Sequence, residues 1–406
     1  MHTITEEAFV LEANEFLKAN AKPRPPERHV FGEGSDSVAL LDERSPDEEL
    51  RDVATAKSWA RKTFDGGFGW ITGPIAYGGR DLPASYQRQY SSIEARYETA
   101  SQGCRAIGLG MVAPTILAHA TEEAKQRYLR DLWRGDIIAC QLFSEPGAGS
   151  DLAGLQTRAT RDGDEWILNG QKVWTSGAQY SDIGEIICRT DPELPKHKAL
   201  TGFIVDMRAR GVEVRPLRQI TGGASFNEVF FTDVRVPADH LLGDVNGGWS
   251  VALTTLMNER ASIGGGGGGA GIGAGSIHRL IDLAGHLGRT EDPLVRQKIA
   301  DTWIHLQVAK YTSSRALEKL RAGELPGPEL SIAKLSLTEN LRRLADLASA
   351  ILGERLVVDT GEWGTYAWSA FVLGVPGFRI AGGTDEVMHN IIGERVLGLP
   401  KEPQAR

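Results

Sequence analysis

The chain has 406 residues, a formal net charge of −8 and 24% charged residues, and this acidic balance disfavours nucleic-acid partners, which select basic surfaces. Cys104, Cys140 and Cys188 are too few and too scattered for a disulfide framework or a zinc site, and the histidines show no metal-binding spacing, so we expect no bound metal. No segment approaches the roughly 18 apolar residues of a membrane span, so we expect a cytoplasmic protein without a membrane partner.

Residues 1–136 are predicted to form an N-terminal α-helical domain. Apolar residues recur three and four positions apart in "EEAFVLEANEFLKA", which starts at Glu6, and in "ATEEAKQRYLRDLWRG", which starts at Ala120. The second segment begins with a helix-start signal at Thr121. At roughly 150 residues per domain, the length of the chain predicts one or two domains beyond this one.

Residues 137–243 are predicted to form a middle antiparallel β domain. Short β-branched and aromatic runs are separated by turn residues in "GEIICRT", "TGFIVDM", "VEVRPLR" and "NEVFFTDVRVP". Upstream of these, "EWILNGQKVWTSG" contains Asn169 and Gly170 between apolar stretches, and this pair is the strongest short-range signal for a hairpin turn. We therefore expect a turn at Asn169-Gly170.

Residues 244–406 are helical again, and about four long periodic runs predict a C-terminal four-helix bundle. The first helix has one apolar stripe, expected to be its buried face, made by Trp249, Ala252, Leu253, Leu256 and Met257. The whole chain is therefore predicted to be an α+β multidomain protein.

Six consecutive glycines start at Gly264, directly after this stripe. A flexible linker, a phosphate-binding loop and a continued helix are the three possible structures. No strand precedes the run and no Gly-Lys-Ser/Thr follows it, which disfavours a phosphate loop, while helical periodicity on both sides favours a helix. Projected at roughly 100° per residue, Arg260 falls near the centre of the stripe and Glu259 about 80° away at its edge, and a charge on a buried face implies a functional partner.

Three motifs resemble those of the acyl-CoA dehydrogenase family, flavoproteins that introduce an α,β double bond into acyl-CoA thioesters. They are "QLFSEPGAGSDLAGL" from Gln141, "NGQKVWTSGA" from Asn169 and "IAGGTDEVMHNIIGERVLGLP" from Ile380. The resemblance runs the length of the chain. It implies FAD as cofactor, with contacts from Gln141, Leu142, Phe143, Ser144, Gly149, Ser150, Trp174, Thr175, Ser176, Thr384, Asp385 and Glu386.

The third motif departs from the common family pattern, because Gly382 stands where many members have the glutamate that removes the substrate α-proton. A branch that includes isovaleryl-CoA dehydrogenase-like enzymes supplies this carboxylate from the first long C-terminal helix, immediately before an arginine, and Glu259-Arg260 matches that position. The resemblance thus implies that Glu259 is the base and that the Gly382 N–H polarises the thioester carbonyl. The implied substrate contacts are Ser150, Met257, Asn258 and Arg260.

Two other functions stay open on this scaffold, a flavin monooxygenase and a non-catalytic partner subunit of a mixed acyl-CoA dehydrogenase tetramer. Glu259 and the complete flavin motif set favour the dehydrogenase. The resemblance also implies an acyl-CoA substrate, an electron-transferring flavoprotein as electron acceptor, and a homotetramer or a heterotetramer with a related chain.

Overall fold

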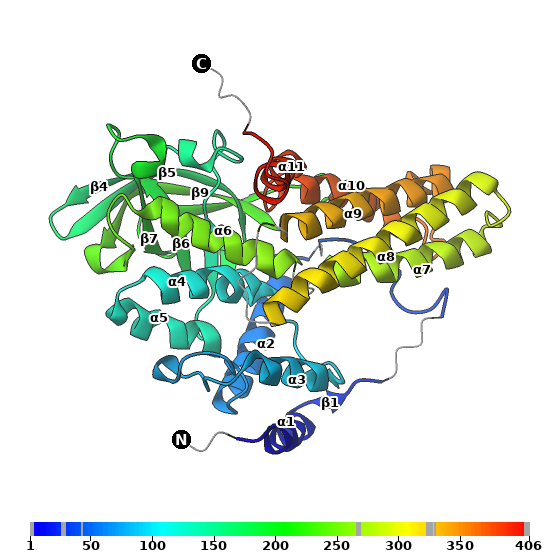
Figure 1. The fold of residues 1–406 in the computed structure, drawn as a ribbon, viewed down its shortest axis with the longest axis horizontal. Helices are drawn as coiled ribbons and strands as arrows, with labels where there is room; N and C mark the ends of the chain where they lie inside the picture. Colours follow the sequence, from blue (N-terminus) through cyan, green and yellow to red (C-terminus); the bar gives the residue numbers. More distant parts are fainter. Residues whose placement is uncertain are drawn as a thin grey trace. The chain divides into compact units, whose positions relative to one another are not determined.

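The computed structural model describes residues 4–25, 30–41, 44–264, 269–321, 328 and 330–401. These residues fall into two compact units. The first contains Met1–Glu27, Arg44–Arg218 and Ala224–Thr255, and the second contains Arg28–Glu43, Gln219–Gly223 and Leu256–Arg406. Figure 1 colours the chain from blue at its N-terminus to red at its C-terminus.

The N-terminal part of the first unit is helical, as the sequence predicts. Thr5 and Thr121 cap their helices by accepting hydrogen bonds from Ala8 N and Ala124 N at 3.2 and 3.3 Å. Ser45 forms a capping box with Glu48. The helices and the small strand pair are α1 (Glu6–Asn20), β1 (Lys22–Pro23), α2 (Pro46–Asp65), α3 (Ala84–Glu94), β2 (Tyr97–Glu98), α4 (Ala113–His119) and α5 (Glu122–Arg134).

The β domain is one eight-stranded sheet with strand order β10-β7-β6-β4-β5-β9-β8, in which β3 joins by pairing with β6. Most neighbours are antiparallel, as expected, but β3 and β4 both run parallel to β6, which makes the sheet mixed. Its strands are β3 (Ala139–Leu142), β4 (Arg158–Asp162), β5 (Glu165–Ser176), β6 (Ile183–Arg189), β7 (Leu200–Asp206), β8 (Val212–Leu217), β9 (Phe226–Pro237) and β10 (Leu241–Leu242).

The expected hairpin turn at Asn169-Gly170 is wrong, because both residues lie inside β5. The turn instead follows Asp162, where Gly163 has a φ of +66° and Glu165 starts the return strand. Gly170 marks a shift in the β5–β9 register, and a Cβ there would lie 2.7 Å from the Thr157 Cα atom. The Asn-Gly pair therefore serves a bulge and a close strand approach rather than a turn.

The second unit contains the predicted helical bundle. Helices α7 (Gly269–His286), α8 (Pro293–Arg321), α9 (Leu330–Leu352) and α10 (Ala367–Ile380) run alongside one another in Figure 1, and α11 (Asp385–Ile391) follows. Their core includes Leu280, Leu344, Trp368 and Phe371, all at most 1% exposed. An N-terminal strap, residues 30–41, packs on this bundle through Phe31 and Leu40.

Helix α6 (Gly248–Gly264) begins in the first unit, where it is packed tightly on β7. A Cβ on Gly248 would lie 2.7 Å from backbone atoms of Thr201, so only glycine fits there. The predicted buried stripe of this helix is only partly correct. Ala252 is fully buried and Trp249 and Leu256 are half-buried, but Leu253 and Met257 are 41% and 60% exposed, and Val251 and Thr255, outside the stripe, are fully buried.

The buried face of α6 includes the polar residue Thr255. Its hydroxyl hydrogen-bonds to Thr115 and Glu185, and these bonds offset the cost of burying it. Of the glycine run, Gly264 ends α6 and Gly269 starts α7, both helical, while residues 265–268 lie outside the described residues.

Candidate active site

The first motif leaves β3 and enters a tight loop. Leu142 and Phe143 are buried at 0% and 5% exposure, Gln141 and Ser144 are half-buried, and Gly149 and Ser150 are exposed. The Val173 N–H donates to Ser144 O at 2.9 Å and joins the loop to β5, which carries the second motif. Both motifs that the sequence assigns to flavin binding are therefore adjacent in one unit.

A buried ion pair, missed by the sequence analysis, holds this loop in place. Lys172 Nζ lies 2.8 Å from Glu145 Oε1 and donates to Phe143 O at 3.0 Å, and the Lys172 side chain is fully buried. Glu145 also accepts backbone hydrogen bonds from Gln156 and Thr157 at 2.6 and 2.9 Å. Burial acts to raise the pKa of Glu145, but Lys172 and these donors outweigh it and lower that pKa.

A signal for this pair was present in the sequence, since Lys172 lies inside the predicted strand segment, directly before Val173 and Trp174. A buried lysine requires a carboxylate or several acceptors nearby. The pair fixes the backbone of the loop that carries the first motif and joins it to β5.

Trp174 lies at a bulge of β5 and has a strained backbone. Its φ is +62°, which a bulky residue rarely adopts, and the register with β9 shifts between Lys172 and Thr175. The bulge turns the Trp174 ring outward, where it is 61% exposed and meets Phe226 edge-on at 6.1 Å. Strain and an exposed indole occur together at functional sites.

Thr175 and Ser176 follow this indole. The Thr175 hydroxyl is buried without a hydrogen-bond partner among the described residues, and Ser176 is half-buried. An aromatic wall, an unpartnered hydroxyl and a braced loop beside it are the groups that an isoalloxazine ring requires, so the residues present fit FAD.

The third motif lies in the second unit. Thr384 caps α11, accepting from Val387 N at 3.2 Å. Asp385 is buried, and its carboxylate accepts from Thr338 and Arg379 at 2.7 Å each and from Lys334 at 3.2 Å. Although burial acts to raise the pKa of Asp385, these donors lower it. The Asp385 side chain thus braces α11 on α9 and α10, while Glu386 is exposed.

Gly382, which precedes α11, is half-buried and has a φ of +66°. Gly383 has a φ of +88°, and a Cβ on it would lie 2.6 Å from the Met388 Cε atom. The loop is therefore built for glycine, and a side chain at position 382 would be strained.

Glu259 is half-buried in α6, four residues after Thr255 and seven after Ala252. At roughly 100° per residue it lies within about 40° of both, so it shares the face that α6 buries. The sequence instead placed Glu259 at the edge of the predicted apolar stripe. Asn258 is half-buried, Met257 is exposed, and the Arg260 side chain lies outside the described residues.

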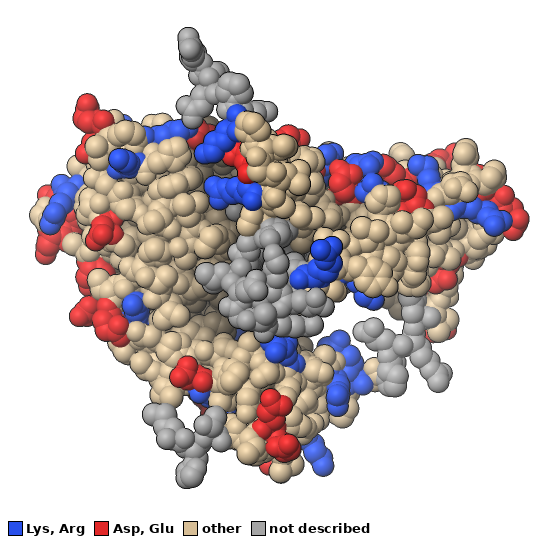
Figure 2. All heavy atoms as spheres, viewed as in Figure 1, with Lys and Arg blue, Asp and Glu red and all other residues tan. Residues whose placement is uncertain are grey.

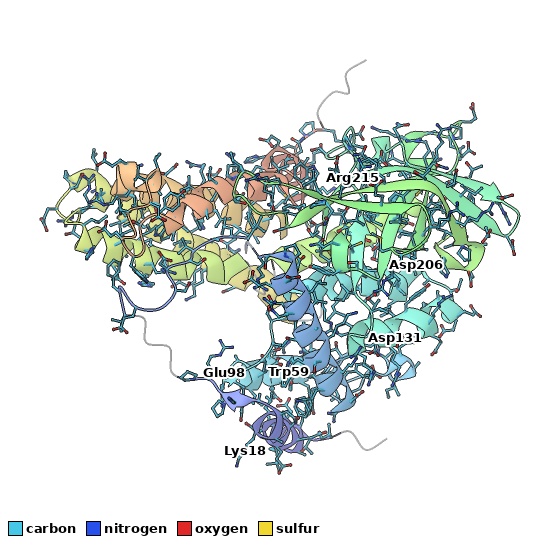
Figure 3. All side chains as sticks on the ribbon, turned by 180° about the vertical axis from the view of Figure 1, so that it is seen from behind. Lys18, Trp59, Glu98, Asp131, Asp206 and Arg215 are labelled. Atoms are coloured by element: carbon cyan, nitrogen blue, oxygen red, sulfur yellow. The ribbon has the colours of Figure 1, made fainter. Side chains whose placement is uncertain are left out.

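A hollow of about 450 Å³ elsewhere in the first unit is lined by residues including Trp59 and Glu98, which Figure 3 labels. None of the motif residues lines it. Within the described ranges no group of His, Cys, Asp and Glu side chains is arranged to hold a metal ion. Every helix in the described part of the chain is too short or too polar to cross a bilayer.

A helical part, a β-sheet that carries an exposed indole beside a braced loop, and a helical bundle together are typical of a flavin-dependent oxidoreductase. Models of the acyl-CoA dehydrogenase N-terminal, middle and C-terminal domains match residues 40–136, 140–234 and 246–397. The chain belongs to the acyl-CoA dehydrogenase family, and its cofactor is FAD.

Several proteins similar to this chain are named acyl-CoA dehydrogenases. Acyl-CoA dehydrogenase IpdE1 from Mycobacterium tuberculosis is 34% identical over 90% of this chain and 93% of its own length. Among solved structures, the Tcur3481-Tcur3483 steroid ACAD has a TM-score of 0.72 and 28% identity, covering 89% of this chain and all of that chain. The ChsE4-ChsE5 complex from Mycobacterium tuberculosis has a TM-score of 0.72 and 26% identity, covering 99% and 100%. These relatives favour the dehydrogenase over the monooxygenase and the non-catalytic partner.

Proposed function

We propose that Glu259 is the base that removes the α-proton of an acyl-CoA thioester in this FAD-dependent dehydrogenase. The observation that carries the proposal is the placement of Glu259 on the buried face of α6, together with a glycine of positive φ at position 382. Gly382 has no carboxylate to offer, and its N–H is the donor proposed for the thioester carbonyl as that oxygen gains enolate charge.

The reaction balances with these groups. The Cα–H bond breaks and its proton moves to the Glu259 carboxylate, the Cβ–H bond breaks with its electron pair, and a Cα–Cβ double bond forms. FAD supplies the acceptor for the hydride that leaves Cβ. Trp174, Ser176 and the loop from Gln141 to Ser150 are proposed to hold the ring, Thr384 to Glu386 to complete its site, and Ser150, Met257, Asn258 and Arg260 to contact the substrate.

The proposed substrate is an acyl-CoA whose acyl group is attached to a steroid skeleton. Support comes from the likeness to the Tcur3481-Tcur3483 steroid ACAD, at 28% identity and full coverage of that chain. Initial rates with a steroid-linked acyl-CoA and with a straight-chain acyl-CoA of matched solubility compare the two classes. A preference for the straight chain would contradict this assignment and leave the Glu259 role intact.

The enzyme is proposed to act as a cytoplasmic tetramer, of identical chains or with a related chain, and to pass electrons to an electron-transferring flavoprotein. An exposed apolar stripe on α8 supports an assembly, since Ile304, Val308 and Tyr311 are 57%, 56% and 65% exposed at helical spacing. The likeness to the ChsE4-ChsE5 complex, which contains two different chains, supports the mixed form.

The experiment that tests the base is Glu259→Gln, which keeps the size of the side chain and removes its basicity. We expect anaerobic flavin reduction by acyl-CoA to fall by about 10²- to 10⁴-fold, because the amide is not basic enough to take the α-proton, while bound FAD per chain is unchanged. Glu123→Gln, at an exposed position of α5, is the matched control. Flavin reduction that persists in Glu259→Gln would exclude Glu259 as the base.

A further inference from the structure

Glu185 is a fully buried carboxyl group that the proposed mechanism does not use. It lies on β6 at 0% exposure, with Gln141 of β3 and Ile204 of β7 as its register partners. Its Oε1 atom is 2.5 Å from the Thr255 hydroxyl, and its Oε2 atom has no hydrogen-bond partner among the described residues. Burial raises the pKa of Glu185 to about 8, an effect that Thr255 partly offsets.

A chain of hydroxyl groups continues from this carboxyl. Thr255 Oγ1 of α6 lies 2.8 Å from Thr115 Oγ1 of α4, and Thr115 donates to Met111 O at 2.9 Å. Each threonine hydroxyl has one proton to donate. Thr255 donates to Glu185 Oε1 and also lies 3.2 Å from Val251 O, and the Thr115 hydroxyl adjoins both Thr255 and Met111 O, so the three side chains form one hydrogen-bonded chain.

This chain joins three elements, β6, α6 and α4, at one residue of α6. Figure 1 draws α6 across the sheet over β6 and β7, with α4 beside it. Thr255 is the last residue of the first unit, and Glu259 follows it in the same helix one turn later. Because a helix is stiff over one turn, fixing the rotation of α6 at Thr255 fixes the direction in which the side chain of residue 259 leaves the helix.

A role in stability alone does not account for a carboxyl group here. A buried acid with one hydrogen bond costs stability relative to an apolar side chain of the same volume. Gln141 and Ile204 beside it are uncharged, and the described residues place no cation within hydrogen-bond reach of it. What the carboxyl adds is a hydrogen bond that ties Thr255 of α6 to β6.

We propose that Glu185 is a positioning residue that orients α6 through Thr255 and Thr115 and thereby aims Glu259 at the substrate α-carbon. The inference rests on the proposed role of Glu259. It predicts that the proton-abstraction step depends on a residue that touches neither the substrate nor FAD.

The test measures exchange of the substrate α-hydrogen in D₂O under anaerobic conditions, the rate of flavin reduction, and the Kd of acyl-CoA. Glu185→Leu and Thr255→Val remove the chain. We expect each to slow α-hydrogen exchange and flavin reduction by about 10- to 100-fold, with FAD content unchanged and Kd within about twofold, because small misplacement of a catalytic group lowers rate more than binding. Glu185→Gln keeps a neutral donor and is expected to stay within about threefold of the parent.

Thermal stability distinguishes a residue that positions Glu259 from a residue that only supports the fold. Glu185→Leu is expected to melt at the same or a higher temperature than the parent while reacting more slowly, a combination that a purely structural role does not produce. Thr63→Val, which removes a buried hydroxyl bonded only within α2, is the control and is expected to leave the rates unchanged. If Glu185→Leu does not fold, Thr255→Val decides alone.

The outcomes for the two proposals are distinct. If Glu259→Gln abolishes exchange but Glu185→Leu and Thr255→Val react like the parent, Glu259 is the base and the positioning role of Glu185 is overturned. If Glu259→Gln still exchanges the α-hydrogen, the proposed base is wrong, and the inference built on it is overturned with it. Slow Glu185→Leu and Thr255→Val variants with a normal Glu185→Gln support the inference.

Discussion

At the scale of single residues, Trp174 combines a cost with a use. Its positive φ costs about 1–2 kcal/mol for a residue with a side chain. Its ring nevertheless projects from the bulge of β5 and is 61% exposed. The strained backbone destabilises the fold, whereas the exposed ring is expected to stabilise bound FAD. Substitutions of Trp174 separate the two effects.

Trp174→Gly is expected to raise the stability of the FAD-free protein by about 1 kcal/mol, because glycine adopts this backbone without strain. The same variant is expected to bind FAD about tenfold more weakly, because the aromatic contact is lost. Urea unfolding of the apoprotein and FAD titration by fluorescence measure the two effects. Trp174→Phe is the control, which retains both the strain and the contact. A glycine variant that is less stable without FAD would contradict the strain argument.

Glu185 gives a pH dependence of stability with a definite sign. Its folded pKa, about 8, lies above its ordinary value of 4.5, so its neutral form is favoured on folding. The associated stability is complete below about pH 4.5 and is lost as pH rises through about 8. His119 on α4 is another titratable group, whose pKa burial lowers, and substituting Glu185 leaves that group in place.

The Glu185→Gln variant lacks this loss. Its stability relative to the parent is therefore expected to increase between about pH 5 and pH 8, by on the order of 2–4 kcal/mol. Urea unfolding at pH 5, 6.5 and 8 measures the difference. A difference that stays constant over this range would mean that Glu185 has the same pKa in the folded and unfolded chain.

At the scale of secondary-structure elements, local signals predicted most helices and strands correctly. Thr121 caps α5 where the sequence predicts a helix start, because a cap depends on only a few neighbouring residues. The Asn169-Gly170 turn was wrong and the buried stripe of α6 was only partly correct, for one reason. Both depend on partners distant in sequence, Thr157 across the bulge and Glu185 beneath the helix.

The candidate site divides in the same way. Motif residues such as Trp174 and Ser144 were recognisable from the sequence because each motif is a short contiguous pattern. The ion pair of Glu145 and Lys172, and the carboxyl of Glu185, were not recognised. Each depends on a contact between distant residues. Glu145 and Lys172 are 27 residues apart in the sequence, and Glu185 and Thr255 are 70 apart.

The close contact between the start of α6 and β7 predicts the effect of adding a methyl group at Gly248. Gly248→Ala places a Cβ within about 3 Å of the Thr201 backbone, which cannot move as a side chain does, and we expect a loss of about 1–3 kcal/mol. Gly285→Ala in α7 is the matched control, since its Cβ meets nothing within 4 Å and helix propensity predicts a gain of up to about 1 kcal/mol. Thermal unfolding of both compares them, and an equal response would contradict the close packing at Gly248.

At the scale of the whole molecule, charge and apolar surface point to different kinds of contact. On the face drawn in Figure 2, basic and acidic side chains of described residues are interspersed over the surface. This mixture agrees with the net charge of −8 and gives no broad basic field. The apolar stripe of α8 is the surface of the bundle that a second chain is expected to cover.

Val308→Asp places a charge in that stripe. We expect it to shift the assembly to smaller species, because a buried unpaired carboxylate at an interface costs several kcal/mol. Ser314→Asp adds the same charge at an exposed polar position of α8 and is the control. Analytical ultracentrifugation reads the mass directly, and an unchanged mass in Val308→Asp would remove α8 from the interface.

The strap of residues 30–41 also has a consequence for how the protein is made. Arg279 donates to Asp36 O and Ser37 O, so this contact joins positions 243 and 242 residues apart. On a ribosome that adds roughly 5–20 residues per second, the strap emerges about 10 to 50 s before the helix that binds it. The bundle therefore completes late in synthesis, and Phe31 and Leu40 of the strap are expected to lack their packing partners until then.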